Sequence, residues 1–363
     1  MRIGIDASRA AVAQRTGTEH YSYQVIRRLL ALAGETPITL YYNQPPPPGL
    51  FAGGEARVIP FPRLWTHLRL SWEMLLRPPD ALFVPAHVLP PVRPRRTVVT
   101  VHDLGYLYHP EAHTRFARWY LDLSTRWNAR VATQVIADSE ATRRDLIRFY
   151  HTPATKIVVV YPGVGREFAP VTDAAARRAA RERYGLPEEY VLYVGTLQPR
   201  KNLARLVQAF AMLCQNTAAP DLVIAGKKGW LYDEIFAQVE ALGLERRVHF
   251  PGYVAQDDLP ALLSGARCFA LPSLYEGFGL PVLEAMACGT PVVCSNVSAL
   301  PEVAGDAALL VDPTDTAALA EALRVAALDE GRRQRLIAAG RAQAARFSWE
   351  RCAREIWGLL ANR

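Results

Sequence analysis

The chain has 363 residues, half of them hydrophobic, and a formal net charge of +7. This length exceeds the size at which one hydrophobic core is the default, so we expect two domains. No stretch reaches the roughly 18 uncharged apolar residues of a membrane-spanning helix, and the N-terminus lacks the pattern of a signal peptide. The sequence therefore predicts a cytoplasmic protein.

The positive charge by itself is compatible with nucleic acid, a membrane surface or phosphorylated ligands. Only four of the 42 basic residues are lysines, so each lysine raises the question of whether a compact ammonium group is needed there. The lysines are Lys156, Lys201, Lys227 and Lys228. The five cysteines are scattered without a CxxC pair, so they indicate neither a zinc site nor a disulfide framework.

Short β-branched runs alternate with longer amphipathic runs along the chain. In the first half we expect strands at 3–6, 38–42, 81–84, 97–101, 135–137 and 157–160. Helices are expected between several of them, at 21–33, 115–132 and 141–150, because their apolar residues recur at three- and four-residue spacing. The second half restarts the alternation with strands at 190–194, 222–225, 248–250, 268–271, 291–294 and 308–311. This order predicts an α/β protein with doubly wound parallel sheets.

The domain boundary is expected in the loop at 161–164, which precedes a polar, Ala/Arg-rich passage at 173–183. We assign 1–165 to an N-terminal Rossmann-like domain and 166–348 to a C-terminal one. The final helical stretch, 349–363, either caps the second domain or crosses back onto the first. The proline run at 45–48 is interpreted as a surface loop.

The segment 271–291, LPSLYEGFGLPVLEAMACGTP, carries the most chemical information. It predicts a strand end, a glycine-rich turn and a short helix, with Pro281 in the first helical turn and Gly289 just after the last. Glycines let the backbone approach a ligand, and the N–H groups that begin a helix bind phosphate. Glu276 and Glu284 bracket this turn, and carboxylates accept hydrogen bonds from sugar diols. The structural alternative is a helix whose acidic N-terminal residue is favoured by the helix dipole.

The form EGFGLPVLEAMACGTPVV closely resembles the signature of family 4 of the retaining, GT-B-fold glycosyltransferases. The resemblance implies two Rossmann-like domains that face a cleft, with a nucleotide-sugar held mainly by the C-terminal domain. It implies that Glu276 contacts the transferred sugar and that Glu284 holds the ribose. The backbone between them is expected to approach the donor through Gly277, Phe278, Gly279 and Leu280.

A second segment, YVGTLQPRKNL at 193–203, opens the C-terminal domain at its first strand-to-helix loop, where doubly wound sheets bind ligands. It resembles the family segment whose two cations neutralise the leaving diphosphate, in the GTLxPRKN form of bacterial mannosyl- and rhamnosyltransferases. Lys201 matches the family lysine. Thr196 stands where many members have arginine, so we assign the second cation to Arg200. The alternative is a solvated Arg–Lys pair that caps the loop.

The hydrophobic run at 98–101 ends in His102 and Asp103. A histidine at the carboxyl end of a strand in this kind of fold commonly faces the ligand crevice. The resemblance places His102 beside the donor sugar, so we include it among the catalytic residues in a positioning role. Asp103 either orients the His102 ring or contacts the acceptor. The alternative is a His–Asp hydrogen bond that only fixes the loop.

Three further loops resemble donor-binding loops of the family, although each signal is weaker. A glycine follows the first strand, where an ordinary helix N-cap by Thr16 or Thr18 explains the sequence almost as well. AGKKG at 225–229 resembles the glycine turn near the diphosphate, and PGYV at 251–254 resembles the segment that seats the nucleobase. The donor-binding residues assigned in these loops and in the 193–203 segment are Gly17, Thr196, Lys227, Gly252 and Val254.

The resemblance implies a retaining glycosyltransferase that needs no cofactor and no metal, since the cations and the helix N-terminus supply the positive charge and no DxD triplet occurs. GDP-mannose is the favoured donor, solely through the GTLQPRKN resemblance. The acceptor is a glycan or a lipid-linked glycan, and nucleic acid is not expected. A GT-B nucleotide-sugar epimerase or hydrolase is the enzymatic alternative, and a two-domain sugar-binding protein is the non-enzymatic one.

The stretch at 60–77 has apolar residues at 64, 65, 68, 72, 75 and 76 and arginines at 63, 69 and 77. This spacing predicts a helix with an apolar face and a basic edge. The favoured interpretation is a crossover helix packed on the sheet with its arginines in water. The alternative is peripheral contact with an anionic membrane at its inner face, because many relatives act on lipid-linked acceptors.

Overall fold

The computed structural model describes residues 1–12, 15, 17–86, 88–112, 114–215 and 219–361. The chain divides into two compact units. Unit 1 comprises 1–107, 113–163 and 348–363, and unit 2 comprises 108–112 and 164–347. The chain leaves unit 1 after Gly163, two residues before the boundary expected from the sequence.

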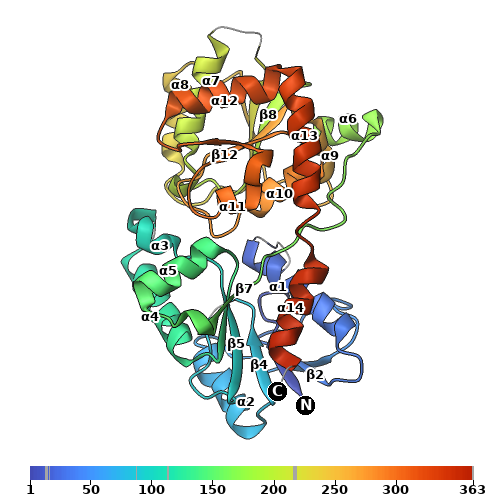
Figure 1. Ribbon diagram of the computed structural model, residues 1–363, viewed down its shortest axis with the longest axis vertical. Helices are drawn as coiled ribbons and strands as arrows, with labels where there is room; N and C mark the ends of the chain where they lie inside the picture. Colours follow the sequence, from blue (N-terminus) through green and yellow to red (C-terminus); the bar gives the residue numbers. More distant parts are fainter. Residues whose placement is uncertain (13–14, 16, 87, 113, 216–218, 362–363) are drawn as a thin grey trace. The chain divides into compact units, whose positions relative to one another are not determined.

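Unit 1 contains a seven-stranded parallel sheet in the order β3-β2-β1-β4-β5-β6-β7, flanked by helices (Figure 1). Its strands are β1 (Ile3–Asp6), β2 (Ile38–Tyr42), β3 (Glu55–Val58), β4 (Ala81–Val84), β5 (Arg96–Val101), β6 (Gln134–Ala137) and β7 (Ile157–Val159). Its helical segments are α1 (Gly17–Leu32), η1 (Thr66–Leu70), α2 (Ser71–Leu76), α3 (Gly105–Tyr108), α4 (Arg115–Val131), α5 (Glu140–Tyr150), η3 (Ala154–Lys156) and α14 (Trp349–Ala361). Strand β3 was not predicted from the sequence. It lies at the edge of the sheet and is largely exposed, so its residues lack an apolar pattern.

The final helix, α14, packs against α1 within unit 1. Its Trp349 is fully buried, and the ring lies edge-on to that of Tyr21 at 5.9 Å. The outgoing and returning segments pass so closely that a Cβ on Gly163 would lie 2.0 Å from the Trp349 nitrogen, which explains why glycine is required there. The last helix therefore crosses back onto the first domain, which was one of the two interpretations of the sequence.

Unit 2 contains a six-stranded parallel sheet in the order β10-β9-β8-β11-β12-β13. Its strands are β8 (Tyr190–Val194), β9 (Asp221–Ala225), β10 (Val248–Gly252), β11 (Cys268–Leu271), β12 (Val292–Ser295) and β13 (Leu309–Val311). Its helical segments are η2 (Pro110–Ala112), α6 (Ala174–Arg183), η4 (Pro199–Lys201), α7 (Leu203–Cys214), α8 (Asp233–Ala241), α9 (Leu259–Gly265), α10 (Leu280–Ala287), α11 (Leu300–Ala304), η5 (Gly305–Ala307), α12 (Thr316–Leu328) and α13 (Glu330–Ala344). Both units are α/β with parallel sheets, which confirms the predicted fold class.

The order of the strands in unit 2 indicates where a ligand is expected to bind. Counted within the unit, the order is 3-2-1-4-5-6, so the winding direction reverses between β8 and β11. In folds of this kind, ligands commonly bind at the carboxyl ends of the strands that flank such a reversal. The two motifs with the strongest sequence signal follow β8 and β11 directly.

The stretch at 60–77 is helical as expected, but it packs through a different face. Trp65, Leu70 and Met74 are buried. The apolar side chains at 64, 68, 72, 75 and 76 are exposed instead, so the favoured interpretation of that apolar face as the packed one is wrong. A π-helical turn at η1 accounts for the change, because it shifts the side chains out of the regular helical register.

Candidate active site

The carboxylate of Glu276, in the loop after β11, lies between two cations from the loop after β8. Lys201 Nζ donates to Glu276 Oε1 at 2.5 Å, and Arg200 Nη1 lies 3.3 Å from Oε2. Ser273 Oγ donates to Oε1 at 2.6 Å. Glu276 is only 8% exposed, so the structure brings three of the predicted catalytic residues into one buried cluster.

The charges of this cluster hold Glu276 in its ionised form. Burial alone would raise the pKa of the carboxyl, because it removes the water that solvates the anion. The charges of Lys201 and Arg200, with the hydrogen bonds from Lys201 and Ser273, outweigh burial and lower its pKa to about 2. Two cations face one anion, so the cluster keeps a net positive charge that suits a phosphate group.

The GTLQPRKN segment forms a 3₁₀ turn that fixes both cations. Pro199 begins η4, and Asn202 ends it in the left-handed conformation with φ of 59°. The Asn202 side chain donates to the Pro272 carbonyl at 3.0 Å and the Pro313 carbonyl at 2.7 Å. Arg200 Nη1 also donates to the Tyr275 carbonyl at 2.5 Å. The loop is thereby tied to the one that carries Glu276, so the alternative of a solvated Arg–Lys pair is wrong.

Helix α10 begins directly after the glycine-rich turn. Its N-cap, Gly279, has φ of 107°, and a Cβ there would lie 2.7 Å from Leu300, so conformation and space both require glycine. Pro281 occupies the first turn, and Gly289 follows the helix with φ of 78°, as the sequence predicted. The Phe278 side chain is buried edge-on against Phe347, which leaves its backbone in the turn. The amides that begin an α-helix lack intrahelical partners and favour an anion.

Glu284, on α10, is half-buried and behaves unlike Glu276. Burial, followed by the charge of Glu167, raises the pKa of Glu284 to about 8. The side chain therefore carries a proton at neutral pH and can donate a hydrogen bond to a hydroxyl. The ribose contact of Glu284 stays a prediction, and the raised pKa means that a protonated carboxyl, not the carboxylate expected from the sequence, would make it.

Neighbouring strands β8, β9 and β10 end in glycines that let their loops pack together. Gly195 N donates to the Ala225 carbonyl, and Gly226 N donates to the Gly252 carbonyl at 2.7 Å. A Cβ on Gly226 would lie 1.8 Å from the Gly195 carbonyl oxygen, so no larger residue fits there.

The remaining donor-binding candidates of unit 2 lie beside these glycines. Lys227 Nζ stands 4.9 Å from the centre of the Tyr253 ring, and Val254 is buried. Thr196 is half-buried in the loop after β8, and its carbonyl accepts from Tyr193 Oη at 3.3 Å. Their roles toward a donor stay predictions.

In unit 1, His102 follows β5, and both of its ring nitrogens face acceptors. Nδ1 lies 2.6 Å from Asp138 Oδ2, and Nε2 lies 2.9 Å from the Pro85 carbonyl. A neutral imidazole has one N–H, so the two acceptors together favour the imidazolium. Burial by itself lowers the pKa of His102, but the charge and hydrogen bond of Asp138 outweigh it and raise the pKa above its usual value.

The partner of His102 is therefore not the adjacent residue. Asp103 Oδ1 accepts from Gly105 N at 2.9 Å and caps the start of α3, so the proposed His102–Asp103 orientation is wrong. Asp138 lies at the end of β6, 36 residues along the chain, and no local pattern marks it. Gly17 begins α1, and a Cβ there would meet open space. Thr16, the alternative N-cap, lies outside the described residues.

Comparisons with known proteins agree with this geometry. Residues 15–168 match the model described as "Glycosyltransferase Family 4", and 176–343 match "Glycosyl transferases group 1". The O-antigen chain mannosyltransferase B of Escherichia coli is 38% identical over 263 residues, which cover 72% of this chain and 69% of that protein. The chain belongs to the group 1 glycosyltransferases.

Solved structures share the fold of this glycosyltransferase along its whole length. Sucrose-phosphate synthase from Thermosynechococcus elongatus has 22% identity and a TM-score of 0.78, covering 99% of this chain and 98% of that one. Anabaena Alr3699/HepE, solved in complex with UDP and glucose, has 21% identity and a TM-score of 0.76, covering all of both chains. At these identities the likeness shows the fold alone, and that fold is GT-B.

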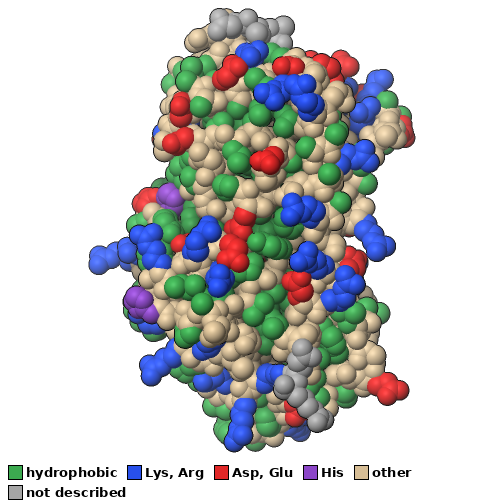
Figure 2. Space-filling model, viewed as in Figure 1, with side chains coloured by type: hydrophobic (Ala, Val, Ile, Leu, Met, Phe, Trp, Pro, Cys, Tyr) green, Lys and Arg blue, Asp and Glu red, His purple; other side chains and the backbone are tan. Residues whose placement is uncertain are grey.

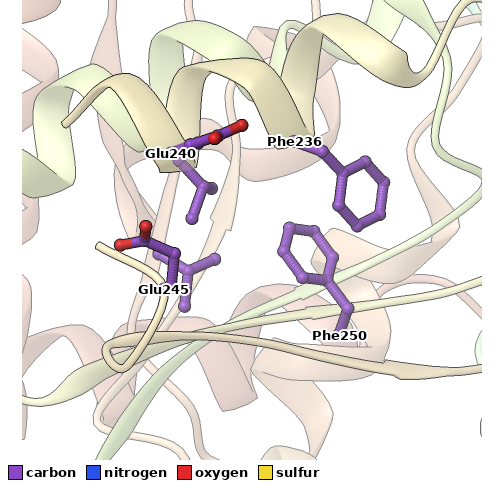
Figure 3. Close-up of a pocket in the computed structure, with 6 residues that line it drawn as sticks. Phe236, Glu240, Glu245 and Phe250 are labelled. Atoms are coloured by element: carbon purple, nitrogen blue, oxygen red, sulfur yellow. The ribbon is translucent and has the colours of Figure 1, made fainter. Parts of the chain in front are cut away.

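A surface cavity of this glycosyltransferase lies elsewhere, between α8 and β10. It measures about 380 Å³, and among the residues that line it the rings of Phe236 and Phe250 stack with centroids 4.4 Å apart (Figure 3). None of the predicted site residues lines it. The predicted cations Arg200 and Lys201 converge on Glu276 and not on this cavity.

Within the described residues of the glycosyltransferase, no cluster of three or more His, Cys, Asp or Glu side chains could hold a metal ion. All five cysteines are free thiols. No helix in the described part of the chain is long and apolar enough to cross a membrane.

Proposed function

We propose that the chain transfers mannose from GDP-mannose to a glycan, with retention of the anomeric configuration and without a metal ion. The observation that carries the proposal is the cluster of Arg200, Lys201 and Glu276 at the strand-order reversal of unit 2. The similarity to an O-antigen chain mannosyltransferase and the GTLQPRKN segment both favour mannose as the transferred sugar.

In the proposed reaction, the two cations bind the diphosphate and stabilise the negative charge that develops as the nucleoside diphosphate leaves. Lys201 and Arg200 exchange their contact with Glu276 for the phosphate oxygens. The Glu276 carboxylate, released from both cations, accepts a hydrogen bond from a hydroxyl of the donor sugar. The N-terminus of α10 adds positive potential on the phosphate side. The acceptor hydroxyl then attacks the anomeric carbon from the face that the leaving group departs. The bond between this carbon and the phosphate oxygen breaks as the glycosidic bond forms, and the hydroxyl proton passes to the departing phosphate.

His102 and Glu284 keep the roles that the family resemblance implies. Both ring N–H groups of the imidazolium form of His102 donate, to Asp138 and to the Pro85 carbonyl, and so fix the loop that carries this histidine. With both nitrogens occupied, His102 does not act as a base, and its proposed role is to position the donor sugar. Glu284, protonated at neutral pH, donates to a ribose hydroxyl. The acceptor is proposed to be a lipid-linked glycan, which brings the protein into peripheral contact with an anionic membrane.

The test is an incubation with GDP-mannose, UDP-glucose and other nucleotide-sugars and a mannose-terminated acceptor. We expect a transfer product from GDP-mannose whose new linkage retains the donor configuration by NMR. Free sugar or an epimerised donor as the main product would instead identify the hydrolase or epimerase alternative. Tight sugar binding without turnover of any donor would identify a binding protein.

A further inference from the structure

Two helical segments of unit 1 leave large apolar side chains in water. In the first, η1 with α2 and the turn before it, Leu64, Leu68, Trp72, Leu75 and Leu76 are each more than half exposed. The last three, on α2, follow the spacing i, i+3, i+4, which places them on one side of the helix. The other side is occupied by the buried Leu70 and Met74, so the exposed stripe is a second apolar face that does not serve the core.

The second segment is α4, which the sequence predicted as a crossover helix between two strands. Phe116, Trp119 and Leu123 are 73%, 58% and 49% exposed and share one face at i, i+3 and i+7. The buried face of the helix holds Thr125 and Asn128, and Asn128 Oδ1 accepts from Leu89 N at 2.9 Å. Leu121, Trp127 and Val131 of α4 also pack on the core of unit 1, so the helix is anchored by this side and presents a separate aromatic stripe to solvent.

The two stripes adjoin. The rings of His67 on η1 and Tyr120 on α4 lie 6.1 Å apart, and each is the chain neighbour of a stripe residue. We call the combined surface the Trp72–Trp119 face. Its residues are Leu64, Leu68, Trp72, Leu75, Leu76, Phe116, Trp119 and Leu123. Scattered exposed apolar residues are ordinary, but a set of this size on adjoining helices indicates a contact surface.

The charge around this face selects its partner. Exposed Arg63 and Arg77 flank the first stripe, and Arg69 pairs with the buried Glu73. Helix α4 adds four exposed arginines, Arg115, Arg118, Arg126 and Arg130, against one acidic residue, Asp122. Blue Lys and Arg side chains project from the region of α4 and α5, with green hydrophobic atoms between them (Figure 2). Two copies of so basic a face would repel each other, whereas an anionic lipid surface attracts it.

We propose that the Trp72–Trp119 face docks onto an anionic lipid bilayer, with the stripes in the interface and the arginines at the phosphate headgroups. Tryptophan and arginine suit this position, because each has a large apolar body and a polar end that remains among the headgroups. This inference rests on the proposed function, since a lipid-linked acceptor places the reaction at such a surface.

The test is flotation of the full chain with vesicles of phosphatidylcholine alone and of phosphatidylcholine with phosphatidylglycerol, at low and moderate salt. Wild type should float with the anionic vesicles at low salt and less at moderate salt. Trp72→Gln with Trp119→Gln should lower vesicle affinity by about 10-fold or more. Arg115→Gln with Arg118→Gln should lower it by about 5-fold for each arginine.

The matched control is Leu231→Gln with Leu242→Gln, which removes two exposed leucines from unit 2 and should float as wild type does. Circular dichroism and the melting temperature confirm that each variant is folded. The inference is overturned if wild type does not float with anionic vesicles at low salt, or if the tryptophan variant floats as well as the control. Sedimentation that shows a dimer lost in the tryptophan variant would assign the face to a second copy instead.

A transfer assay with a water-soluble acceptor separates the two hypotheses. Failure of lipid docking alone leaves transfer to the soluble acceptor intact. Failure of the proposed function alone removes transfer while flotation persists.

Discussion

Lys201 Nζ lies 2.5 Å from Glu276 Oε1, although the two residues are 75 positions apart in the chain. The lysine therefore already has an anionic partner inside the site. In the proposed mechanism, a donor diphosphate competes with Glu276 for this cation, and the exchange would couple phosphate binding to the release of a carboxylate for the sugar.

Glu276→Gln should separate these two effects. Transfer is expected to fall by about 10- to 150-fold, since the hydrogen bond that a sugar hydroxyl donates to a charged acceptor is lost. Affinity for the nucleoside diphosphate should be unchanged or higher, because the cations no longer have an anionic competitor. Calorimetry and initial rates measure the two quantities. A parallel loss of both would contradict the exchange and make Glu276 a purely structural anchor for the cations.

Lys201→Ala should lower turnover more than it weakens binding of the intact donor. The ammonium group interacts most strongly with the charge that develops on the leaving phosphate, so its loss affects the transition state more than the ground state. Comparison of kcat with the donor dissociation constant checks this expectation. Lys228→Ala is the matched control, because Lys228 lies over the rings of Tyr232 and Phe236 away from Glu276. Equal losses in both quantities would make Lys201 a binding residue only.

The raised pKa of Glu284, about 8 against an ordinary 4.5, predicts the pH dependence of stability. The folded state keeps a proton that the unfolded chain releases above pH 4.5, so wild-type stability should fall as the pH rises from about 4.5 to 8. Glu284→Gln, which mimics the protonated acid, should remove this component of the fall. Melting temperatures between pH 5 and pH 9 check the difference, and an identical pH profile in the variant would contradict it.

Nucleotide binding provides a second measurement on the same glutamate. Near pH 7, Glu284→Gln should bind the nucleoside diphosphate within a few-fold of wild type, because an amide also donates a hydrogen bond. Glu284→Ala should weaken binding by about 5- to 150-fold. Unchanged affinity in the alanine variant would remove Glu284 from the ribose contact.

The pair of His102 and Asp138 predicts a titration shift in unit 1. The pKa of His102 is raised above 6.5 in the folded state, so its protonation stabilises the fold. This contribution is fully present below pH 6.5 and is lost as the pH rises through the pKa that His102 has in the folded state. Asp138→Asn should lower the pKa of His102, observed in the NMR titration of its ring protons. Asp103→Asn is the control and should shift it less, since Asp103 bonds Gly105. A larger shift from the control would reverse the assignment.

Transfer should persist in EDTA. In the proposed mechanism the positive charge comes from Lys201, Arg200 and the N-terminus of α10. Removal of divalent ions should therefore change the initial rate by less than about 2-fold. A catalytic metal contributes several kcal/mol, so its removal would have a far larger effect. Rates with EDTA and with added Mg²⁺ or Mn²⁺ check this. An activity that disappears in EDTA and returns specifically with one of these ions would refute a metal-free reaction.

The sequence by itself determined the class of fold and the chemistry of the main loops. Strand–helix alternation is a local periodicity, and the glycine, proline and charge spacing at 193–203 and 271–291 is local too. Such patterns act through backbone conformation within a few residues, so they appear in a single sequence. One local helix signal was missed. The polar passage at 173–183 was not predicted as a helix, but it forms α6, whose N-terminus is capped by the Asp173 side chain.

Tertiary structure decided which of these local pieces act together. Strand order makes β8 and β11 neighbours and so brings Lys201 to Glu276 and Ser273. The same long-range arrangement gives His102 the distant Asp138 as its partner. Tertiary contacts also set the opposite pKa shifts of the two glutamates, because burial raises the pKa of Glu284 whereas the nearby charges of Lys201 and Arg200 outweigh burial at Glu276. The sequence showed the apolar face of the helix at 60–77 but not its exposure, because the periodicity of a helix with two apolar faces does not say which one meets the core.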